Sequence, residues 1–229
     1  INWEGEPIVL DSSVKEDPKI LADVKNFNKP LIKLRNKVIG KTDTLLDGDF
    51  KNCRFIECTL GDVVTNAFLW SVKQQGVQVA LQNGGGIRSS IPKGKVTLGH
   101  VLEAFPFSNT LSTFKIKGDI LKKVIEHGVS RADDPGNEGT GRFLQVSGLH
   151  YQYDPSLPVG ERVKNIKVKQ SDGSLVPFNL KEVYTVVTND FIRKGGDGYS
   201  LLRDFAIDPY DYGPMLSDVV RDYIRLQTP

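Results

Sequence analysis

Hydrophobic residues recur at two different spacings along the chain, and these spacings predict both helices and strands. Apolar positions three or four residues apart predict helices within residues 18–29, 60–75, 98–105, 120–128 and 214–224. Alternating or continuous apolar residues predict strands within residues 77–81, 149–153, 163–168, 175–178 and 184–188. Asp172-Gly173 separates two of these strands and indicates a hairpin. We therefore expect an α+β fold, with mixed sheets and flanking helices.

Local signals suggest where these helices begin and end. Asp17 and Thr97 are predicted N-caps, because each precedes a helical apolar pattern with a side-chain oxygen that can accept from the first turn. Residues 59–62 (Thr-Leu-Gly-Asp) resemble a capping box, with Asp in place of Glu. Pro30 is expected to kink or end the first helix, and Gly76 to stop the second.

The first forty of the 229 residues differ from the rest of the chain. Residues 1–11 end in an apolar run without a local partner, which predicts an orphan strand. Residues 12–39 hold the first helix and a polar stretch, and we interpret them as a linker. A single compact domain is expected over residues 40–229.

Composition narrows the classes of function. The 30 Lys and Arg residues nearly balance 28 Asp and Glu residues and form no basic tract, so nucleic-acid binding through a basic face is unsupported. No run of about 18 apolar residues exists, and we expect no membrane span. His100, His127 and His150 lie far apart and outside any metal-ligand motif, and no nucleophile motif is present. We expect no catalytic residue and no metal site in this chain.

The two cysteines, Cys53 and Cys58, enclose four residues. This spacing is too wide for a redox motif, and no further Cys or His lies nearby to complete a zinc site. Two interpretations stay open from the spacing alone: unrelated thiols, or a local disulfide, which would indicate an oxidising compartment.

Two glycine clusters follow predicted strands and could let a ligand approach the backbone. The first, residues 83–88, matches neither common phosphate-loop motif, so a tight turn is the simpler interpretation. Arg88 after it either clamps a phosphate or lies on the surface. The second cluster, residues 194–198, contains Asp197, which either accepts from ribose hydroxyls or stabilises a turn.

Two phenylalanines lie close to these clusters. Phe107 and Phe191 could stack on a base, an interaction worth about 1–3 kcal/mol per base. The alternative is that both belong to the hydrophobic core.

Read in order, several blocks resemble the C-terminal domain of the 5'-nucleotidase family, which includes ecto-5'-nucleotidases, apyrases and UDP-sugar hydrolases. The blocks are residues 4–10 (EGEPIVL), 53–58 (CRFIEC) with 60–62 (LGD), 83–88 (NGGGIR), 105–107 (FPF), 141–148 (GRFLQVSG) and 189–198 (NDFIRKGGDG). Their order and rough spacing match the family over essentially the whole chain, and the CRFIEC block is closest to eukaryotic ecto-enzymes.

The resemblance implies a role for each predicted site residue. Phe107 and Phe191 would sandwich the base, and Asp197 would hold the ribose hydroxyls. The remaining residues would line the pocket around the nucleoside and phosphate: Arg54 and Arg88 at phosphate oxygens, Asn83 and Gly86 nearer the nucleoside. The family pattern also implies a disulfide between Cys53 and Cys58, which would fix the turn that carries Arg54.

The resemblance further implies a partner domain outside this chain. In the family, a preceding metallophosphoesterase domain performs hydrolysis with two divalent metal ions, for which we expect zinc. Residues 1–11 would be the last strand of that domain, and residues 12–39 the connecting helix. We expect this chain to be part of a secreted or extracellular nucleotide hydrolase that acts on an adenosine- or AMP-like ligand. The chain alone is expected to be inactive. A non-catalytic secreted nucleotide-binding module is the alternative.

One departure from the family pattern bears on the pocket. Arg193 and Lys194 stand in the loop that leads into the second glycine cluster, where other members often carry small or polar residues. They would either add to phosphate binding or face solvent.

Overall fold

The computed structural model describes residues 5–132 and 140–228. Its helices are α1 (Pro18–Arg35), α2 (Phe50–Cys53), α3 (Thr59–Ser71), α4 (Leu98–Ala104), α5 (Gly118–Gly128), α6 (Asp190–Arg193), α7 (Ser200–Phe205) and α8 (Leu216–Gln227). Short 3₁₀ turns are η1 (Lys73–Gln75), η2 (Gly84–Gly86), η3 (Thr140–Arg142) and η4 (Gly196–Gly198). Its strands are β1 (Val38–Thr42), β2 (Val79–Asn83), β3 (Gly94–Thr97), β4 (Leu111–Lys117), β5 (Leu144–Ser147), β6 (Leu149–Tyr153), β7 (Val163–Lys169), β8 (Leu175–Pro177), β9 (Val183–Asn189) and β10 (Ile207–Tyr210). The α+β prediction is confirmed.

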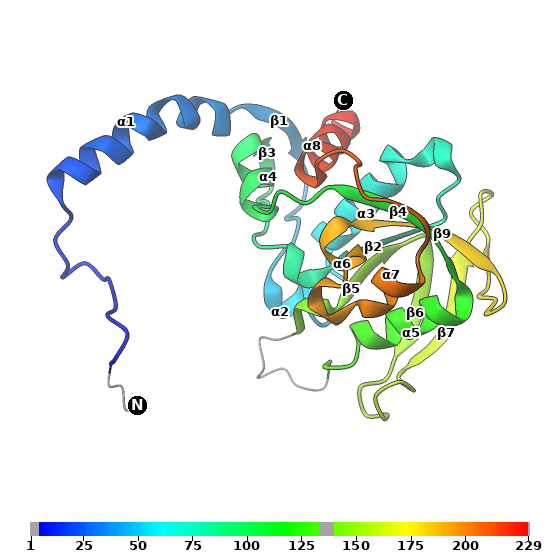
Figure 1. Cartoon of the computed structure of the whole chain (residues 1–229). Helices are drawn as coiled ribbons and strands as arrows, with labels where there is room; N and C mark the ends of the chain where they lie inside the picture. Colours follow the sequence, from blue (N-terminus) through cyan, green and yellow to red (C-terminus); the bar gives the residue numbers. More distant parts are fainter. Residues whose placement is uncertain (1–4, 133–139, 229) are drawn as a thin grey trace.

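A central mixed sheet organises the domain, with the strand order β10-β4-β9-β2-β5 (Figure 1). The neighbouring strands β2 and β9 run parallel, and the other pairs in this sheet are antiparallel. Because β2 and β9 run parallel, their carboxyl ends lie at the same edge of the sheet. Both strands end in asparagine, Asn83 and Asn189.

Side chains on the two faces of this sheet enter separate hydrophobic cores. Ala80 of β2 and Val187 of β9 pack with α3 and α8 on one face. Val79 and Val186, each one residue earlier, pack with α5 and the hairpin β6–β7 on the other. This alternation follows from the two-residue repeat of a strand, and it explains why the buried central strands contain continuous apolar runs.

Two smaller sheets flank the central one. The antiparallel pair β1–β3 brings the start of the compact domain beside the segment before α4. The sheet β6-β7-β8 is antiparallel throughout, and the tight turn between β7 and β8 contains Gly173 at φ +87°. The hairpin predicted from Asp172-Gly173 is therefore confirmed.

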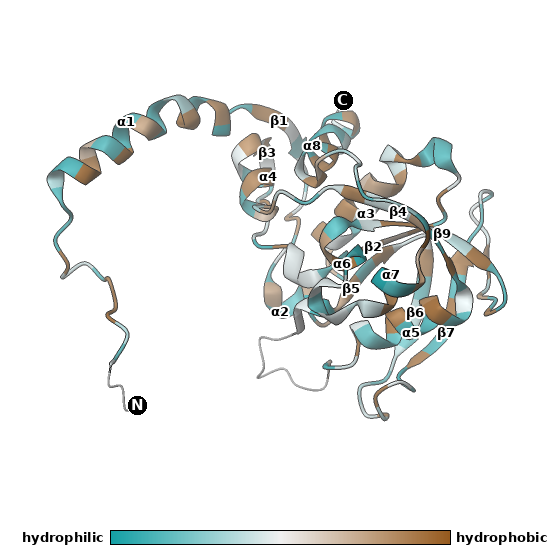
Figure 2. Cartoon of the chain, viewed as in Figure 1, coloured by the Kyte–Doolittle hydropathy of each residue, from teal (hydrophilic) through white to brown (hydrophobic). Residues whose placement is uncertain are grey.

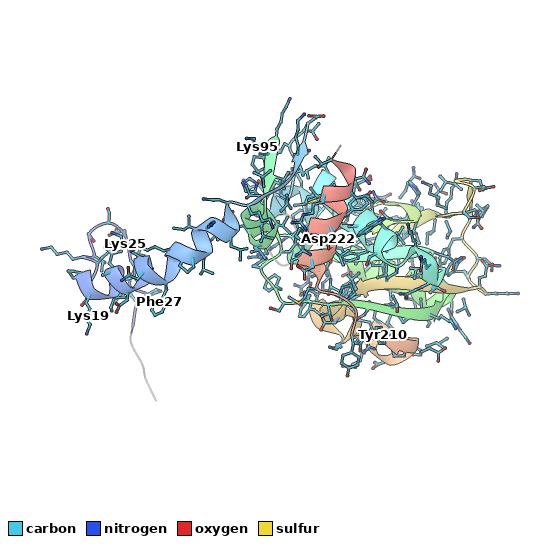
Figure 3. All side chains as sticks on the ribbon, turned by 90° about the horizontal axis from the view of Figure 1, so that it is seen from above. Lys19, Lys25, Phe27, Lys95, Tyr210 and Asp222 are labelled. Atoms are coloured by element: carbon cyan, nitrogen blue, oxygen red, sulfur yellow. A yellow bond between two sulfur atoms is a disulfide. The ribbon has the colours of Figure 1, made fainter. Side chains whose placement is uncertain are left out.

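Helix α1 extends away from the compact domain (Figures 1 and 3). Asp17 caps it as predicted, because its side chain accepts hydrogen bonds from the amides of Lys19 and Ile20. Pro30 was expected to kink or end this helix. It does not end it, because α1 continues to Arg35. None of its residues is buried, and hydrophobic and hydrophilic residues alternate along its length (Figure 2).

The expected orphan strand is not formed in the part of residues 1–11 that the structure describes. Residues 5–11 belong to no strand and are exposed. A strand needs a neighbour for its backbone hydrogen bonds, and the described part of the chain pairs no strand with residues 5–11. The glycine-, proline- and aspartate-containing sequence of residues 131–141 predicts a loop, and most of this segment falls outside the described residues.

Several predicted helix ends also differ. Cys58, not Thr59, is the N-cap of α3, and it makes no side-chain capping bond. The Thr59 hydroxyl accepts a hydrogen bond from the amide of Asp47 instead of capping the helix. Helix α3 ends at Ser71, and Gly76 follows only after η1, in the left-handed conformation. Helix α8 begins at Leu216, two residues beyond Pro214. The capping box of α4 at Thr97 is present, with His100 as its second member.

Candidate functional site

A cavity of about 340 Å³ opens where the carboxyl ends of β2 and β9 meet. It is lined by all seven residues predicted for substrate binding: Arg54, Asn83, Gly86, Arg88, Phe107, Phe191 and Asp197. Gly85, Asn109 and Gly141 complete the lining. The last three were not predicted as pocket residues, although each lies in or beside a block that carries the family resemblance. Ligands commonly bind beyond the carboxyl ends of parallel strands in this way.

Close backbone contacts explain the glycines of residues 83–88. A Cβ at Gly84 would lie 2.2 Å from the carbonyl oxygen of Cys53, and one at Gly86 would lie 2.2 Å from Nε2 of Gln82. Any side chain at these positions would displace the turn that carries Arg54 or a buried amide beneath the cavity. These glycines therefore permit tight packing of the cavity wall.

Asp197 lies within η4 in the left-handed conformation, at φ +53°. Asn83 donates from Nδ2 to Asp197 Oδ2 at 2.7 Å. His127 donates from Nε2 to the Asp197 carbonyl oxygen at 2.9 Å and packs edge-on against Tyr199, with ring centroids 4.7 Å apart. Burial lowers the pKa of His127, and the charge of Arg142 acts in the same direction. The hydrogen bond from the neutral imidazole of His127 thus fixes the position of the Asp197 backbone.

Both pocket phenylalanines lie outside the two cores. Phe107 is 48% exposed and Phe191 45% exposed, whereas the core residue Phe68 is fully buried. Phe107 follows α4, and Phe191 lies in α6, whose first turn is capped by the side chain of Asn189. A Cβ at Gly196 would lie 2.6 Å from the Phe191 ring, so this glycine lets the chain pass close to the ring. The alternative that both are core residues is wrong.

The two arginines of the cavity come from separate segments. Arg54 follows α2, and its guanidinium carbon lies 5.5 Å from the centroid of the Phe50 ring. Arg88 is exposed and donates from Nη1 to the carbonyl oxygen of Gly85 at 3.5 Å. The cavity therefore has two cationic groups and two half-exposed aromatic rings.

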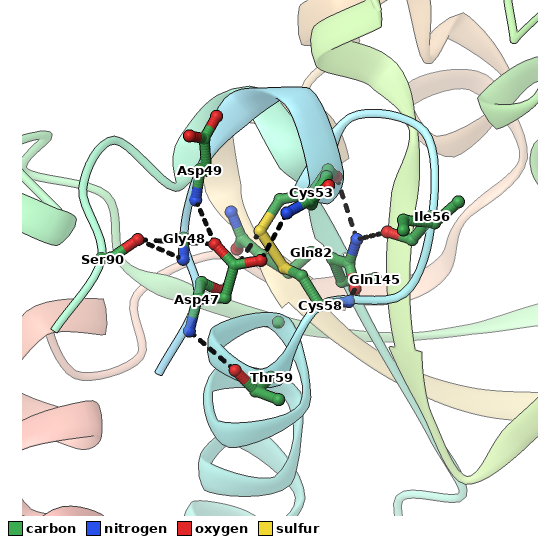
Figure 4. Close-up of a disulfide and its surroundings, with 12 residues drawn as sticks. Asp47, Gly48, Asp49, Cys53, Ile56, Cys58, Thr59, Gln82, Ser90 and Gln145 are labelled. Carbon is green, nitrogen blue, oxygen red and sulfur yellow. Dashed lines mark hydrogen bonds between the residues drawn. A yellow bond between two sulfur atoms is a disulfide. The ribbon is translucent and has the colours of Figure 1, made fainter. Parts of the chain in front are cut away.

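The turn that carries Arg54 is closed by a disulfide between Cys53 and Cys58, whose Cα atoms are 5.1 Å apart (Figure 4). The side-chain amide of Gln145 also bridges the turn. It donates to the carbonyl oxygens of Cys53 and Ile56 at 2.9 and 2.7 Å, and its Oε1 accepts from the amide of Cys58 at 3.0 Å. The disulfide that the family pattern implied is present, but the role of Gln145 was not predicted.

Arg193 and Lys194 do not line the cavity. Arg193 forms a bidentate ion pair with Asp211, at 2.7 and 2.5 Å, and both side chains are largely buried. Lys194 pairs with Asp190 at 3.0 Å. Both basic side chains are therefore engaged by carboxylates of the chain itself.

A second cavity, of about 470 Å³, lies beside the disulfide turn and is lined by none of the predicted site residues. Glu57 and Asp62 are among its lining residues. Burial raises the pKa of Asp62 to about 6, and the neighbouring carboxylate of Glu57 acts in the same direction.

The described ranges offer neither a cluster of metal ligands nor a membrane-spanning helix. Residues 5–132 and 140–228 contain no cluster of three or more His, Cys, Asp or Glu side chains able to hold a metal ion. None of the helices in those ranges has the length and hydropathy needed to cross a membrane.

Comparisons with known proteins agree on one family. Residues 38–204 match the model of the 5'-nucleotidase C-terminal domain. The chain is 35% identical to human 5'-nucleotidase, covering 98% of this chain and 40% of that protein, and 33% identical to the snake venom 5'-nucleotidase of Naja atra, covering 98% and 44%. A crystal structure of a 5'-nucleotidase precursor from Thermus thermophilus superposes with a TM-score of 0.85 at 39% identity, covering 93% of this chain and 41% of that one. The chain thus spans about two fifths of these relatives.

Proposed function

Because this chain belongs to the 5'-nucleotidase family, as its C-terminal domain, we propose that the 340 Å³ cavity selects the nucleoside part of a 5'-nucleotide for hydrolysis by another domain. The observation that carries the proposal is the convergence of residues from distant segments on one cavity. Residues 54, 83–88, 107 and 191–197 are far apart in the chain and are joined only by the fold. Their chemistry matches the three parts of a nucleotide.

Each part of the ligand has a complementary group in the proposed complex. The base stacks between Phe107 and Phe191, whose rings are half-exposed. The ribose hydroxyls donate to the carboxylate of Asp197, which Asn83 already holds. Arg54 and Arg88 attract the phosphate, since planar guanidinium groups pair well with its oxygens. An adenosine- or AMP-like ligand fits this set.

Hydrolysis is assigned to a preceding metallophosphoesterase domain with two divalent metal ions, for which zinc is expected. The described residues of this chain do not offer a donor set for such ions. We therefore assign no metal-dependent step to this chain. The exposed apolar side chains of α1, such as Ile20 at 64% and Phe27 at 79%, support a partner domain that would cover them.

We also propose that the whole protein works outside the cell. A disulfide at the cavity wall favours an oxidising compartment, because such bonds are rare in reducing ones. Relatives named as venom 5'-nucleotidases are consistent with this location.

Calorimetric titration with adenosine tests the assignment of the base. Phe191→Ala should weaken binding by about 5- to 150-fold, the equivalent of about 1–3 kcal/mol of stacking. Phe205→Ala is the matched control, because Phe205 is similarly exposed at 49% but does not line the cavity. Equal affinities of the parent and Phe191→Ala would refute the stacking assignment.

A second measurement tests whether hydrolysis requires another domain. The chain incubated with AMP and zinc should release no phosphate, because the catalytic groups are assigned to another domain. Metal-dependent turnover by the purified chain would overturn that assignment. Binding without turnover even when the preceding domain is present would favour a non-catalytic module.

A further inference from the structure

A network of three buried side-chain amides lies directly beneath the cavity. Gln82 and Asn83 end strand β2, and Asn189 ends the parallel strand β9. Gln82 and Asn189 are fully buried, and Asn83 is 3% exposed. Burying an amide side chain costs free energy of folding unless its polar atoms are hydrogen-bonded. The hydrogen bonds within this network therefore decide how each amide is oriented.

Backbone groups fix the orientation of Asn189 and Gln82. The amide of Ile192 can only donate, and it lies 3.0 Å from Asn189 Oδ1, so Asn189 directs Nδ2 toward β2. The carbonyl oxygen of Asn83 can only accept, and it lies 3.0 Å from Gln82 Nε2. Gln82 therefore turns Oε1 toward Asn189 Nδ2, at 3.0 Å.

These two amides then determine the orientation of Asn83. Its Oδ1 accepts from Asn189 Nδ2 at 2.9 Å and from Gln82 Nε2 at 3.2 Å. Its Nδ2 is thereby directed to the cavity, where it donates to Asp197 Oδ2 at 2.7 Å. Within the described part of the chain, Asp197 Oδ1 makes no hydrogen bond, and it is the oxygen left for a ligand.

We propose that Asn189 is a positioning residue for nucleoside recognition, which sets the amide of Asn83 and through it the carboxylate of Asp197. The same side chain caps helix α6, which carries Phe191, so one residue joins the group proposed to bind ribose to the group proposed to bind the base. This inference rests on the proposed function, because it assumes that Asp197 accepts from the ribose hydroxyls.

Removal of the Asn189 donor has a definite consequence. Without Nδ2, the amide of Asn83 keeps only the longer bond from Gln82 and can rotate, which brings an oxygen opposite the Asp197 carboxylate. Two acceptors repel each other, so Asp197 leaves the position in which a vicinal diol could donate to it. Ligands that lack both hydroxyls should be affected far less.

Asn189→Ser tests this step, because serine is also a good N-cap and can retain the bond to Ile192 while losing the amide donor. The probes are adenosine and 2',3'-dideoxyadenosine, titrated into the 229-residue chain. We expect the dissociation constant for adenosine to rise about tenfold, as for the loss of one hydrogen bond to a charged group, and that for the dideoxy analogue to change less than about twofold. A merely structural role would weaken both ligands equally.

Three further variants separate the possible failures. Val220→Ala in α8 removes buried apolar volume from a helix that does not line the cavity and controls for general destabilisation; it should leave the ratio of the two affinities unchanged. Asp197→Ala should abolish the preference for adenosine, and Asn189→Ser should have no further effect in that background. Asn189→Asp, which also retains the cap, serves if Asn189→Ser fails to fold.

The outcomes are distinct. If Asp197→Ala loses the preference and both Asn189 variants keep it, the positioning role is overturned while the proposed function stands. If Asp197→Ala keeps the preference, the ribose assignment fails, and the inference fails with it. A readout without ligand is the side-chain NH₂ signal of Asn83 in nitrogen-15 NMR. In the parent its protons should exchange slowly with water, and in Asn189→Ser the exchange should become faster; unchanged exchange would also overturn the proposal.

Discussion

Gln145 donates a hydrogen bond to the carbonyl oxygen of Cys53 at 2.9 Å (Figure 4). This bond connects β5, an edge strand of the central sheet, to the turn that carries Arg54. Gln145 is 2% exposed and uses both ends of its amide in the same turn. A Cβ at Gly61 would lie 2.3 Å from Gln145 Oε1, so the start of α3 packs directly on this side chain. One wall of the cavity therefore depends on a single buried amide as well as on the disulfide.

Gln145→Leu should destabilise the domain by about 3 kcal/mol, because it leaves buried backbone groups of the turn without partners. Chemical denaturation followed by tryptophan fluorescence measures this loss. Gln152→Ala is the control: Gln152 is an exposed glutamine of the neighbouring strand β6, and its loss should matter by less than about 0.5 kcal/mol. Equal stability of the two variants would show that Gln145 does not support the turn.

Replacement of both cysteines by serine should lower the free energy of unfolding by about 2 kcal/mol, as expected for a short closed loop. The hydrogen bonds of Gln145 would still hold the turn, so adenosine binding should fall by less than in a chain that also carries Gln145→Leu. A thiol count on unfolded protein is the first check. Two reactive thiols in protein prepared from an oxidising source would contradict the disulfide.

Arg193→Ala should lower stability near neutral pH by about 2 kcal/mol, because it leaves the largely buried carboxylate of Asp211 without its bidentate partner. Lys194→Ala removes an exposed pair four residues apart in sequence and should lower stability by at most about 0.5 kcal/mol. Urea denaturation of the two variants side by side measures the contrast.

The effect of Arg193→Ala should also depend on pH. Burial acts to raise the pKa of Asp211, but Arg193, Ser112 and Lys194 together outweigh it, so the pKa lies below the ordinary value. A lowered pKa in the folded state means that the stabilisation is present above the unfolded pKa, near 4, and is lost as the pH falls through the folded pKa. The gap between parent and variant should therefore narrow toward about pH 3. A gap that stays constant would argue against the ion pair.

Asp62 should titrate near pH 6, because burial and the neighbouring Glu57 raise its pKa to about 6. A carboxyl group with a raised pKa in the folded state favours folding at low pH, and this contribution is lost as the pH rises through about 6. Carbon-13 NMR of the Asp62 carboxyl measures the midpoint. Glu57→Gln removes one of the two causes and should move the midpoint down; an unchanged midpoint would leave burial as the whole cause.

Elements with strong local signals were predictable from the sequence. The apolar stripes of α3 and α5, the cap of α4 at Thr97 and the turn at Gly173 depend on residues close in the chain, and the structure contains all of them. The strands β1, β3, β4, β5 and β10 were not predicted. Strand β4 lies between β9 and β10 in the sheet, and its short pattern of alternation becomes a strand only when those partners are present.

The sequence by itself, through the order of its blocks, determined the family and which residues were expected at the pocket. Only the tertiary structure decided that these residues share one cavity, that Phe107 and Phe191 stay outside the cores, and that Arg193 is held by Asp211. It also brought Asn189 of β9 beside Asn83 of β2, although 106 residues separate them. The physical reason is that residue types and short-range spacing are properties of the chain, whereas hydrogen bonds across parallel strands exist only after the strands have paired.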